Sequence, residues 1–302
     1  MKRNKIVSAL LVITLVSLAG CAHRIPAGAI LAYQGTYNEA KSLESDSDIV
    51  TDDSVTTKLQ SHVHDAEDSD EAKVALYKPN YVTMNPEDRD LKFQLSYRIR
   101  LYKFSKSLNL FLSQTHKAYW AITTEKSAPF REHNFNPELF LRWKTPENYL
   151  YLKYVQFGFE HESTGVAGSL SRGWNRLTGQ AEWTFNSNDH TKPGHIHAYV
   201  RGWVILDRDT VNNKDIGDHL GLGEIFISYT LHELPNFPIP IPAQSEVAIT
   251  KRLHSIMFEF GFNVPGPDFL GYIQYWTGRG EWLVGYNEDT KIFRAGLKFL
   301  IH

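Results

Sequence analysis

The most constraining feature of this sequence is a regular alternation of apolar and polar residues over long segments. In residues 91–101, LKFQLSYRIRL, each odd position is apolar or aromatic and each even position is polar or charged. Residues 293–299, FRAGLKF, repeat the pattern, with Arg294 and Lys298 on the polar face. Successive side chains of a β-strand point to opposite faces. The sequence therefore predicts β-strands that have one apolar and one polar face.

Three features favour a membrane-spanning sheet over a soluble β-sandwich, which would also alternate. The predicted strands run for about ten residues, the length that crosses a bilayer at a tilt. Their polar faces carry Arg, Lys and Gln in mid-strand, as a lumen would, and Tyr and Trp recur near strand ends, as in interfacial girdles. A sheet in lipid must close on itself, because an open edge leaves backbone groups unsatisfied.

The expected fold class is all-β. About 11 candidate strands are recognisable, and because bacterial barrels normally have an even number, the prediction is a 12-stranded antiparallel transmembrane β-barrel. Residues 73–84, KVALYKPNYVTM, are the candidate for the strand that this count omits.

The N-terminus predicts export and lipid attachment. Residues 1–20 read as a signal peptide, with a basic start followed by the apolar run IVSALLVITLVSL. The run ends in LAGC, which is similar to a bacterial lipobox, so we expect Cys21 to be lipidated; the alternative is a chance cysteine near an ordinary cleavage site. Cys21 is the only cysteine, which excludes an intrachain disulfide. Residues 21–74 are predicted to be a polar, acidic, flexible spacer, and residues 75–302 the outer-membrane barrel domain.

Composition excludes other classes. The 32 Lys+Arg and 34 Asp+Glu residues nearly balance, which argues against nucleic acid as a partner. After the N-terminal segment no apolar run reaches the length of a transmembrane helix, so none is expected in the mature chain.

The segment FGFEHESTG places polar residues on an apolar strand face. His161 and Ser163 share odd parity with Phe157 and Phe159, and Asn175 lies on the apolar face of the next predicted strand. Polar groups facing lipid are costly and need a reason. A serine beside a histidine that a third group orients is the arrangement of a hydrolase, and lipid would be its substrate. Taken singly, each residue also fits a structural role at a turn or strand end.

These motifs resemble those of the bacterial outer-membrane phospholipase A family. The likeness rests on HESTG, on SRGWNR at 171–176, on SAPFREHNFNPELFLRW at 127–143 and on the segment 275–297. It implies a 12-stranded barrel that hydrolyses acyl esters of phospholipids and lysophospholipids at both positions. It further implies dependence on Ca²⁺ and activity as a homodimer in the outer membrane. The nucleophile would be Ser163, the base His161, and the residue that orients the base Asn175.

The same resemblance implies a calcium site and an oxyanion donor. The calcium ligands would be Ser171, the backbone carbonyl of Val166 and Ser127 from a partner subunit. The amide of Gly165 would stabilise the oxyanion. Calcium prefers oxygen ligands and keeps waters, through which it would polarise the ester carbonyl.

The sequence departs from the family pattern at several places. Thr164 stands where the family has asparagine, and Gly173 where it has serine, so calcium affinity could differ. The lipobox is unusual for the family, and the Pro-rich segment 232–245 looks like an insertion without an assigned function. The alternative function is a non-catalytic outer-membrane barrel, either a pore or a structural lipoprotein, with a decayed site. A soluble esterase is disfavoured because the chain lacks a Gly-x-Ser-x-Gly elbow.

One further hypothesis concerns the dimer. In LFLSQTHKAYW, residues 110–120, the even positions include Gln114 and His116 on an otherwise apolar face. Two polar residues there would be expensive in a monomer. We expect them to form hydrogen bonds across the dimer interface, with a register error or a bulge as the alternative.

Overall fold

The computed structural model describes residues 73–122, 130–146, 150–185, 194–231, 245–264 and 269–299. All of these belong to one compact unit, Leu59–His302. The predicted signal peptide, Cys21 and nearly all of the spacer lie outside the described residues, as do Ser127 and most of the segment 232–245. Within the described ranges, no helix is long and apolar enough to cross a membrane.

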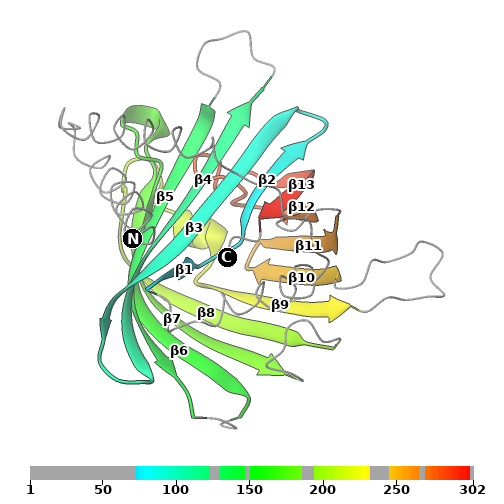
Figure 1. Cartoon of the computed structure of the whole chain (residues 1–302). Coiled ribbons are helices and arrows are strands. Elements are labelled where there is room, and N and C mark those ends of the chain that lie inside the picture. Colours follow the sequence, from blue (N-terminus) through cyan, green and yellow to red (C-terminus); the bar gives the residue numbers. More distant parts are fainter. Residues whose placement is uncertain are drawn as a thin grey trace, which may run out of the picture. The chain divides into compact units, whose positions relative to one another are not determined.

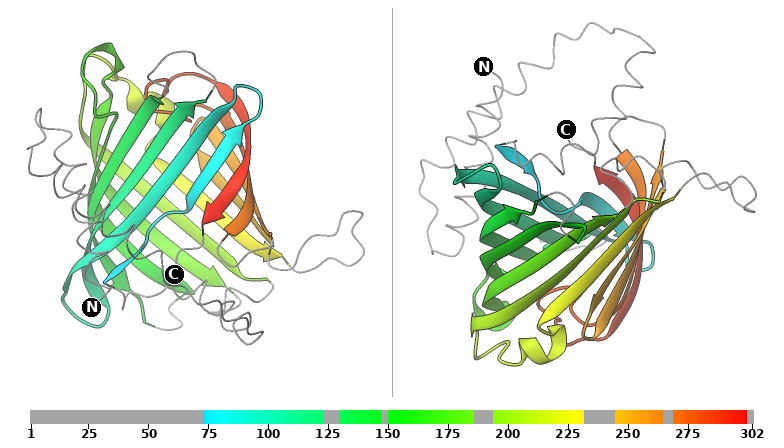
Figure 2. Two further views of the ribbon diagram at one scale, coloured as in Figure 1. Left: turned by 45° about the horizontal axis from the view of Figure 1, so that its top comes forward. Right: turned by 90° about the horizontal axis from the view of Figure 1, so that it is seen from below.

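Twelve antiparallel strands close into a barrel (Figure 1). The strands of the closed wall are β2 (Asn80–Asn85), β3 (Asp90–Lys103), β4 (Leu108–Ala121), β5 (Phe130–Lys144), β6 (Leu152–Ser163), β7 (Gly173–Phe185), β8 (Ile196–Arg208), β9 (Gly223–Leu231), β10 (Ser245–Arg252), β11 (Ser255–Asn263), β12 (Phe269–Gly278) and β13 (Thr290–Phe299). Neighbours in this order pair with one another, and β13 returns to pair with β2. Figure 2 shows the resulting wall of inclined strands. The 12-stranded prediction is confirmed, and β2 is the strand in the segment 73–84.

A short additional strand, β1 (Val74–Leu76), pairs with the same edge of β3 as β2 does. The chain leaves the ladder between β1 and β2, and Tyr77 and Lys78 lie in this break. The Tyr77 hydroxyl donates to Glu138 Oε2 at 2.7 Å, so a residue in this break is hydrogen-bonded to β5. The segment 73–84 therefore forms two short strands that pair with β3, rather than one continuous strand.

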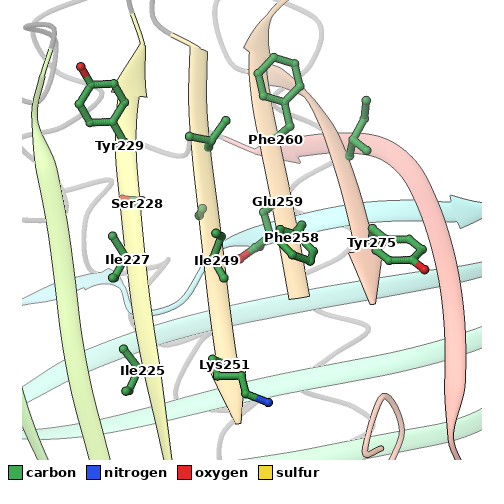
Figure 3. Close-up of a pocket in the computed structure, with 13 residues that line it drawn as sticks. Ile225, Ile227, Ser228, Tyr229, Ile249, Lys251, Phe258, Glu259, Phe260 and Tyr275 are labelled. Atoms are coloured by element: carbon green, nitrogen blue, oxygen red, sulfur yellow. The ribbon is translucent and has the colours of Figure 1, made fainter. Parts of the chain in front are cut away.

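The outer face of the wall is apolar. Phe157 on β6 is 64% exposed and Val204 on β8 is 63% exposed. Across β9 to β12, Figure 3 shows Ile225, Ile227 and Ile249 as part of a shallow apolar groove on the barrel wall. Exposed apolar side chains at alternate positions are what a lipid-facing strand presents. The parity prediction for the outer face is confirmed on these strands, whereas Tyr97 and Ile99 of β3, also predicted to face outward, are buried at 4% and 3% exposure.

Many inward positions carry charged side chains, and several of these charges are paired. Arg201 on β8 contacts Glu138 at 2.7 Å and Glu160 at 3.2 Å, and Arg294 on β13 contacts Asp90 at 3.0 Å. Buried charges are tolerated when they are paired and hydrogen-bonded. These ion pairs join strands that are distant in sequence across the interior of the barrel.

One end of the barrel is filled by its own loops. The connection between β12 and β13 carries Glu281, whose carboxylate pairs with Lys92 at 2.9 Å and with Arg294 at 3.3 Å. The short helix α5 (Ile216–Leu220) joins an apolar cluster at this end. The members of the cluster are Trp174, Trp203, Ile216, Leu220, Leu283 and Tyr286. Since β6, β8 and β12 all end here, these loops surround the region that follows Ser163.

Candidate active site

His161 and Ser163 lie at the C-terminal end of β6, and Asn175 faces them from β7. The register pairs His161 with Asn175 and Ser163 with Gly173. The short connection between the strands contains only one regular element, the 3-10 helix η1 (Gly168–Leu170). The sequence prediction that an antiparallel neighbour brings Asn175 beside His161 is confirmed.

The three side chains form a continuous hydrogen-bonded chain. His161 Nδ1 lies 2.8 Å from Asn175 Oδ1, and His161 Nε2 lies 2.9 Å from Ser163 Oγ. Because the amide oxygen can only accept, Nδ1 carries the proton and Nε2 is left as the acceptor. The serine hydroxyl then donates to Nε2. This is the tautomer in which the imidazole can take the serine proton.

The hydrogen-bonded residues Asn175, His161 and Ser163 lie on the outer face of the barrel. Phe159 and Leu177, which flank them on the same face, are 46% and 50% exposed. Ser163 itself is 8% exposed, so its hydroxyl is shielded by its neighbours. A substrate that reaches this serine approaches along the lipid-facing surface rather than through the lumen.

Glu162, between the histidine and the serine, points to the opposite face. Its Oε2 accepts from Trp174 Nε1 at 3.0 Å and from Arg176 at 2.9 Å, and Lys117 lies 3.9 Å from Oε1. The inward partners of Glu162 therefore tie the end of β6 to β7 and β4. This arrangement fixes the parity that puts His161 and Ser163 together on the outer face.

The loop that follows Ser163 is closed by Thr164. Its backbone N–H donates to the Arg172 carbonyl at 3.0 Å, and its hydroxyl donates to the Leu170 carbonyl at 3.0 Å. The hydroxyl also accepts from the Arg172 N–H at 3.1 Å. Thr164 thus links both ends of the loop, through its backbone N–H and through the two hydrogen bonds of its hydroxyl.

Gly165 has a backbone conformation that requires glycine. Its φ is +66°, and a Cβ there would lie 2.8 Å from the ring of Phe135 on β5. Positive φ is accessible to glycine at little cost. The Phe135 ring therefore packs directly on the backbone of the residue that the resemblance assigns as oxyanion donor. At Gly173, the other departure, a Cβ would lie 3.6 Å from the Cβ of Ser163, an ordinary contact, so the local packing does not require glycine.

The oxygen groups near Ser171 suit a hard cation. Val166 is exposed in the loop, and Ser171 lies beside the carboxylate of Asp209, the first residue after β8. Hydrogen bonds from Asn212, Val211 and Ser171 hold the pKa of the Asp209 carboxyl below its usual range. Carbonyl, hydroxyl and carboxylate oxygens are the ligands that calcium takes. In the described part of the chain no group of three or more His, Cys, Asp or Glu residues could hold a metal, so such a site would depend on these oxygens.

Asp209 was not predicted from the sequence. The available signal was its position directly after a strand that ends on the same side of the barrel as Ser163. Parity alone does not show which loops meet, so the carboxylate could be assigned only from the structure.

Gln114 and His116 occupy positions of β4 that alternate with its lumen-facing residues, but Gln114 is only 1% exposed and His116 is partly buried. His116 Nε2 is 3.1 Å from His133 Nδ1 on β5, and its ring stacks on Phe135 at 4.8 Å between centroids. The histidine therefore has a polar partner within its own barrel. Gln114 Nε2 donates to the Thr115 carbonyl at 3.2 Å, whereas its Oε1 has no hydrogen-bond partner among the described residues.

The fold and the site define a transmembrane β-barrel that carries a Ser-His-Asn chain on its outer wall. A family model described as Phospholipase A1 matches residues 53–299. The chain belongs to this family. It is therefore an outer-membrane phospholipase, an ester hydrolase.

Relatives and solved structures agree with this assignment. The phospholipase A1 of Proteus vulgaris is 32% identical over 240 residues, which cover 78% of this chain and 76% of that protein. The phospholipase A1 of Escherichia coli K12 is 29% identical over 209 residues, which cover 67% of each. Outer membrane phospholipase A from Escherichia coli has the same fold, with a TM-score of 0.64 at 24% identity, covering 76% of this chain and 98% of that one. The outer membrane phospholipase dimer of Salmonella typhi with bound calcium matches at a TM-score of 0.64 and 23% identity, covering 80% of this chain and 97% of that one.

Proposed function

We propose that this protein is a calcium-dependent phospholipase with A1 and A2 activity that hydrolyses acyl esters of phospholipids and lysophospholipids. The observation that carries the proposal is the chain of two short hydrogen bonds from Asn175 through His161 to Ser163 on the lipid-facing wall. A hydrolytic site exposed to lipid suits a substrate that stays in the membrane.

The reaction follows from the tautomer. Ser163 Oγ attacks the ester carbonyl carbon while its proton passes to His161 Nε2, and Asn175 holds the Nδ1 proton in place. His161 then donates the proton to the departing alcohol oxygen of the lysophospholipid. Water, deprotonated by His161, cleaves the acyl-serine and releases the fatty acid. Asparagine lacks the charge of aspartate, so it orients the imidazole with less electrostatic stabilisation of the imidazolium.

The oxyanion is stabilised beside Ser163. The Gly165 N–H, held by the positive φ of that residue, is the proposed donor. The proposed calcium ligands are the Val166 carbonyl, Ser171 and Ser127 of a partner subunit, and the Asp209 carboxylate beside Ser171 adds a further oxygen. When bound, calcium would act as a Lewis acid that polarises the ester carbonyl.

The active form is proposed to be a homodimer that buries part of the outer face of β4. Gln114 and His116 are the proposed interface residues. The Oε1 of Gln114 is buried and has no hydrogen-bond partner among the described residues, and a donor from a partner subunit would satisfy it. The calcium-bound relative from Salmonella typhi, a dimer, is consistent with such an assembly. Since His116 already contacts His133, its part in the interface is expected to be smaller than that of Gln114.

A non-catalytic barrel is the alternative function. A pore would need an open lumen, whereas Glu281 and the apolar cluster fill one end of this barrel. A decayed site would be expected to lose its internal hydrogen bonds, and these are intact. Both observations favour the enzyme.

The N-terminal assignments remain proposals. We propose that residues 1–20 are removed, that Cys21 carries the lipid anchor, and that the spacer joins it to the barrel. Globomycin should then block processing of the precursor. Processing that is insensitive to globomycin would instead indicate an ordinary secretory signal peptide without lipidation of Cys21.

The deciding experiment uses purified protein in mixed micelles of phospholipid and detergent. Fatty-acid release is measured with calcium and with a chelator, for the wild type and for Ser163→Ala. Calcium-dependent release that Ser163→Ala abolishes is the expected result. Release that survives either treatment contradicts the mechanism, and no release by the wild type with any phospholipid favours the non-catalytic barrel.

A further inference from the structure

The hydrogen-bond ladder between β5 and β6 has a gap beside the proposed catalytic histidine. Phe135 pairs with Ser163 and Glu138 pairs with Glu160, but the two residues between them on β5, Asn136 and Pro137, have no partner in this ladder. Proline lacks the backbone N–H that a ladder needs and is normally excluded from the middle of a sheet. A proline at this point needs an explanation.

The phase of the ladder identifies the group that loses its donor. Further along the same strands, the Thr145 N–H donates to the Lys153 carbonyl at 3.1 Å. Hydrogen-bonded pairs recur at every second residue of an antiparallel ladder. Pro137 is an even number of residues from Thr145, and His161 is equally far from Lys153. The nitrogen of Pro137 therefore occupies the position from which β5 would donate to the His161 carbonyl.

The side chain of Asn136 supplies the missing donor. Its Nδ2 donates to the His161 carbonyl at 2.8 Å, and the residue is 5% exposed. The orientation of the amide is fixed from the other side, because Lys78 Nζ donates to Asn136 Oδ1 at 3.3 Å. An ammonium group can only donate, so it selects the rotamer that turns Nδ2 toward the carbonyl. Lys78 lies in the break between β1 and β2, so this break places the ammonium group that orients Asn136.

We propose that Asn136 is a positioning residue for ester hydrolysis, replacing the ladder hydrogen bond absent at Pro137 and fixing the backbone of His161. The inference rests on the proposed catalytic role of His161. The imidazole spans contacts of 2.8 Å and 2.9 Å, so a small shift of its backbone disturbs both together. Asn136 touches neither substrate nor Ser163 Oγ in this role; it acts through His161.

The test is a rescue experiment in the full-length protein. Asn136→Ala should lower kcat about tenfold with KM nearly unchanged, since one hydrogen bond to the backbone of His161 is lost. Pro137→Ala alone should remain active. The double variant, Asn136→Ala with Pro137→Ala, should recover most of kcat, because the new backbone N–H can donate to the His161 carbonyl. Asn134→Ala is the matched control, a buried asparagine on the same strand and face.

A second readout is independent of activity. Amide hydrogen exchange in peptides that cover residues 157–163 should accelerate in Asn136→Ala and return to the wild-type rate in the double variant. If Asn136→Ala keeps its kcat and its exchange rate, or if the double variant is as impaired as the single one, the positioning role is wrong. If the wild type hydrolyses no phospholipid, the proposed function fails, and the exchange rates still decide whether Asn136 holds the His161 backbone.

Discussion

Asn175 Oδ1 accepts from His161 Nδ1 at 2.8 Å, and the two residues are register partners on adjacent strands. The sheet itself therefore sets this contact, because the pairing of β6 with β7 leaves the two side chains opposite each other on the outer face. An amide oxygen at this position selects one tautomer of the imidazole. The remaining ring nitrogen is the one that meets Ser163.

Replacing Asn175 should therefore impair the base without abolishing it. We expect Asn175→Ala to lower kcat by roughly ten- to a hundredfold, a smaller loss than removal of the nucleophile, because only the orientation of the imidazole is lost. Initial rates on phospholipid micelles measure it. Val200→Ala, on the outer face of β8, serves as the control and should stay near wild type. An Asn175→Ala enzyme with full kcat would remove asparagine from the mechanism.

Gly165 and Gly168 form a matched pair that separates backbone strain from steric clash. Both have positive φ, of +66° and +80°, but a Cβ at Gly165 meets the Phe135 ring at 2.8 Å, whereas nothing lies within 4 Å of a Cβ at Gly168. Alanine at either position costs about 1 kcal/mol of backbone strain. Gly165→Ala should additionally displace the oxyanion donor and lower kcat by on the order of a hundredfold. Equal kcat values in the two variants would show that the contact with Phe135 does not matter.

Much of this arrangement was predictable from the sequence because a strand has only two faces. The parity of residues 157–163 assigned His161 and Ser163 to the apolar side, and the alternation in 91–101 predicted which residues of β3 face the lumen. The role of Asn136 could not be predicted in this way. It depends on which carbonyl Pro137 leaves without a donor, and this follows from the ladder phase between two strands. The contact between Asp209 and Ser171 likewise depends on how two loops meet.

Glu162 should contribute to stability rather than to chemistry. Its carboxylate accepts from Trp174 and Arg176 inside the barrel. We expect Glu162→Gln to lower the free energy of unfolding by about 2 kcal/mol, because hydrogen bonds to a charged group are weakened. Urea titration of the reconstituted barrel measures this change. An unchanged unfolding midpoint would mean that Lys117 and Arg176 are satisfied equally well by other partners, such as Glu160.

Thr164 offers a clean test of the loop closure. Thr164→Val keeps the shape of the side chain but removes the hydroxyl that bonds the Leu170 carbonyl and the Arg172 N–H. The loop that carries Val166 and Ser171 should then be less ordered, and the calcium concentration for half-maximal activity should rise by about ten- to thirtyfold, because two hydrogen bonds of about 1 kcal/mol each are lost. Thr164→Ser keeps the hydroxyl and should behave like the wild type. A Thr164→Ser variant as weak as Thr164→Val would point to the methyl group instead.

Calcium binding should depend on the oxygens of two separate loops. Ser171→Ala removes a proposed ligand from the loop after β6, and Asp209→Asn removes the charge of the neighbouring carboxylate without changing its size. Each variant should raise the half-maximal calcium concentration by about tenfold or more, because calcium affinity follows the number and charge of its oxygen ligands. At saturating calcium both should approach the wild-type kcat, since neither residue belongs to the Ser-His-Asn chain. Asp207→Asn, two residues earlier on β8, is the control for the loss of a charge. A reduced kcat at saturating calcium, with the half-maximal concentration unchanged, would instead place Asp209 in the chemistry of ester cleavage.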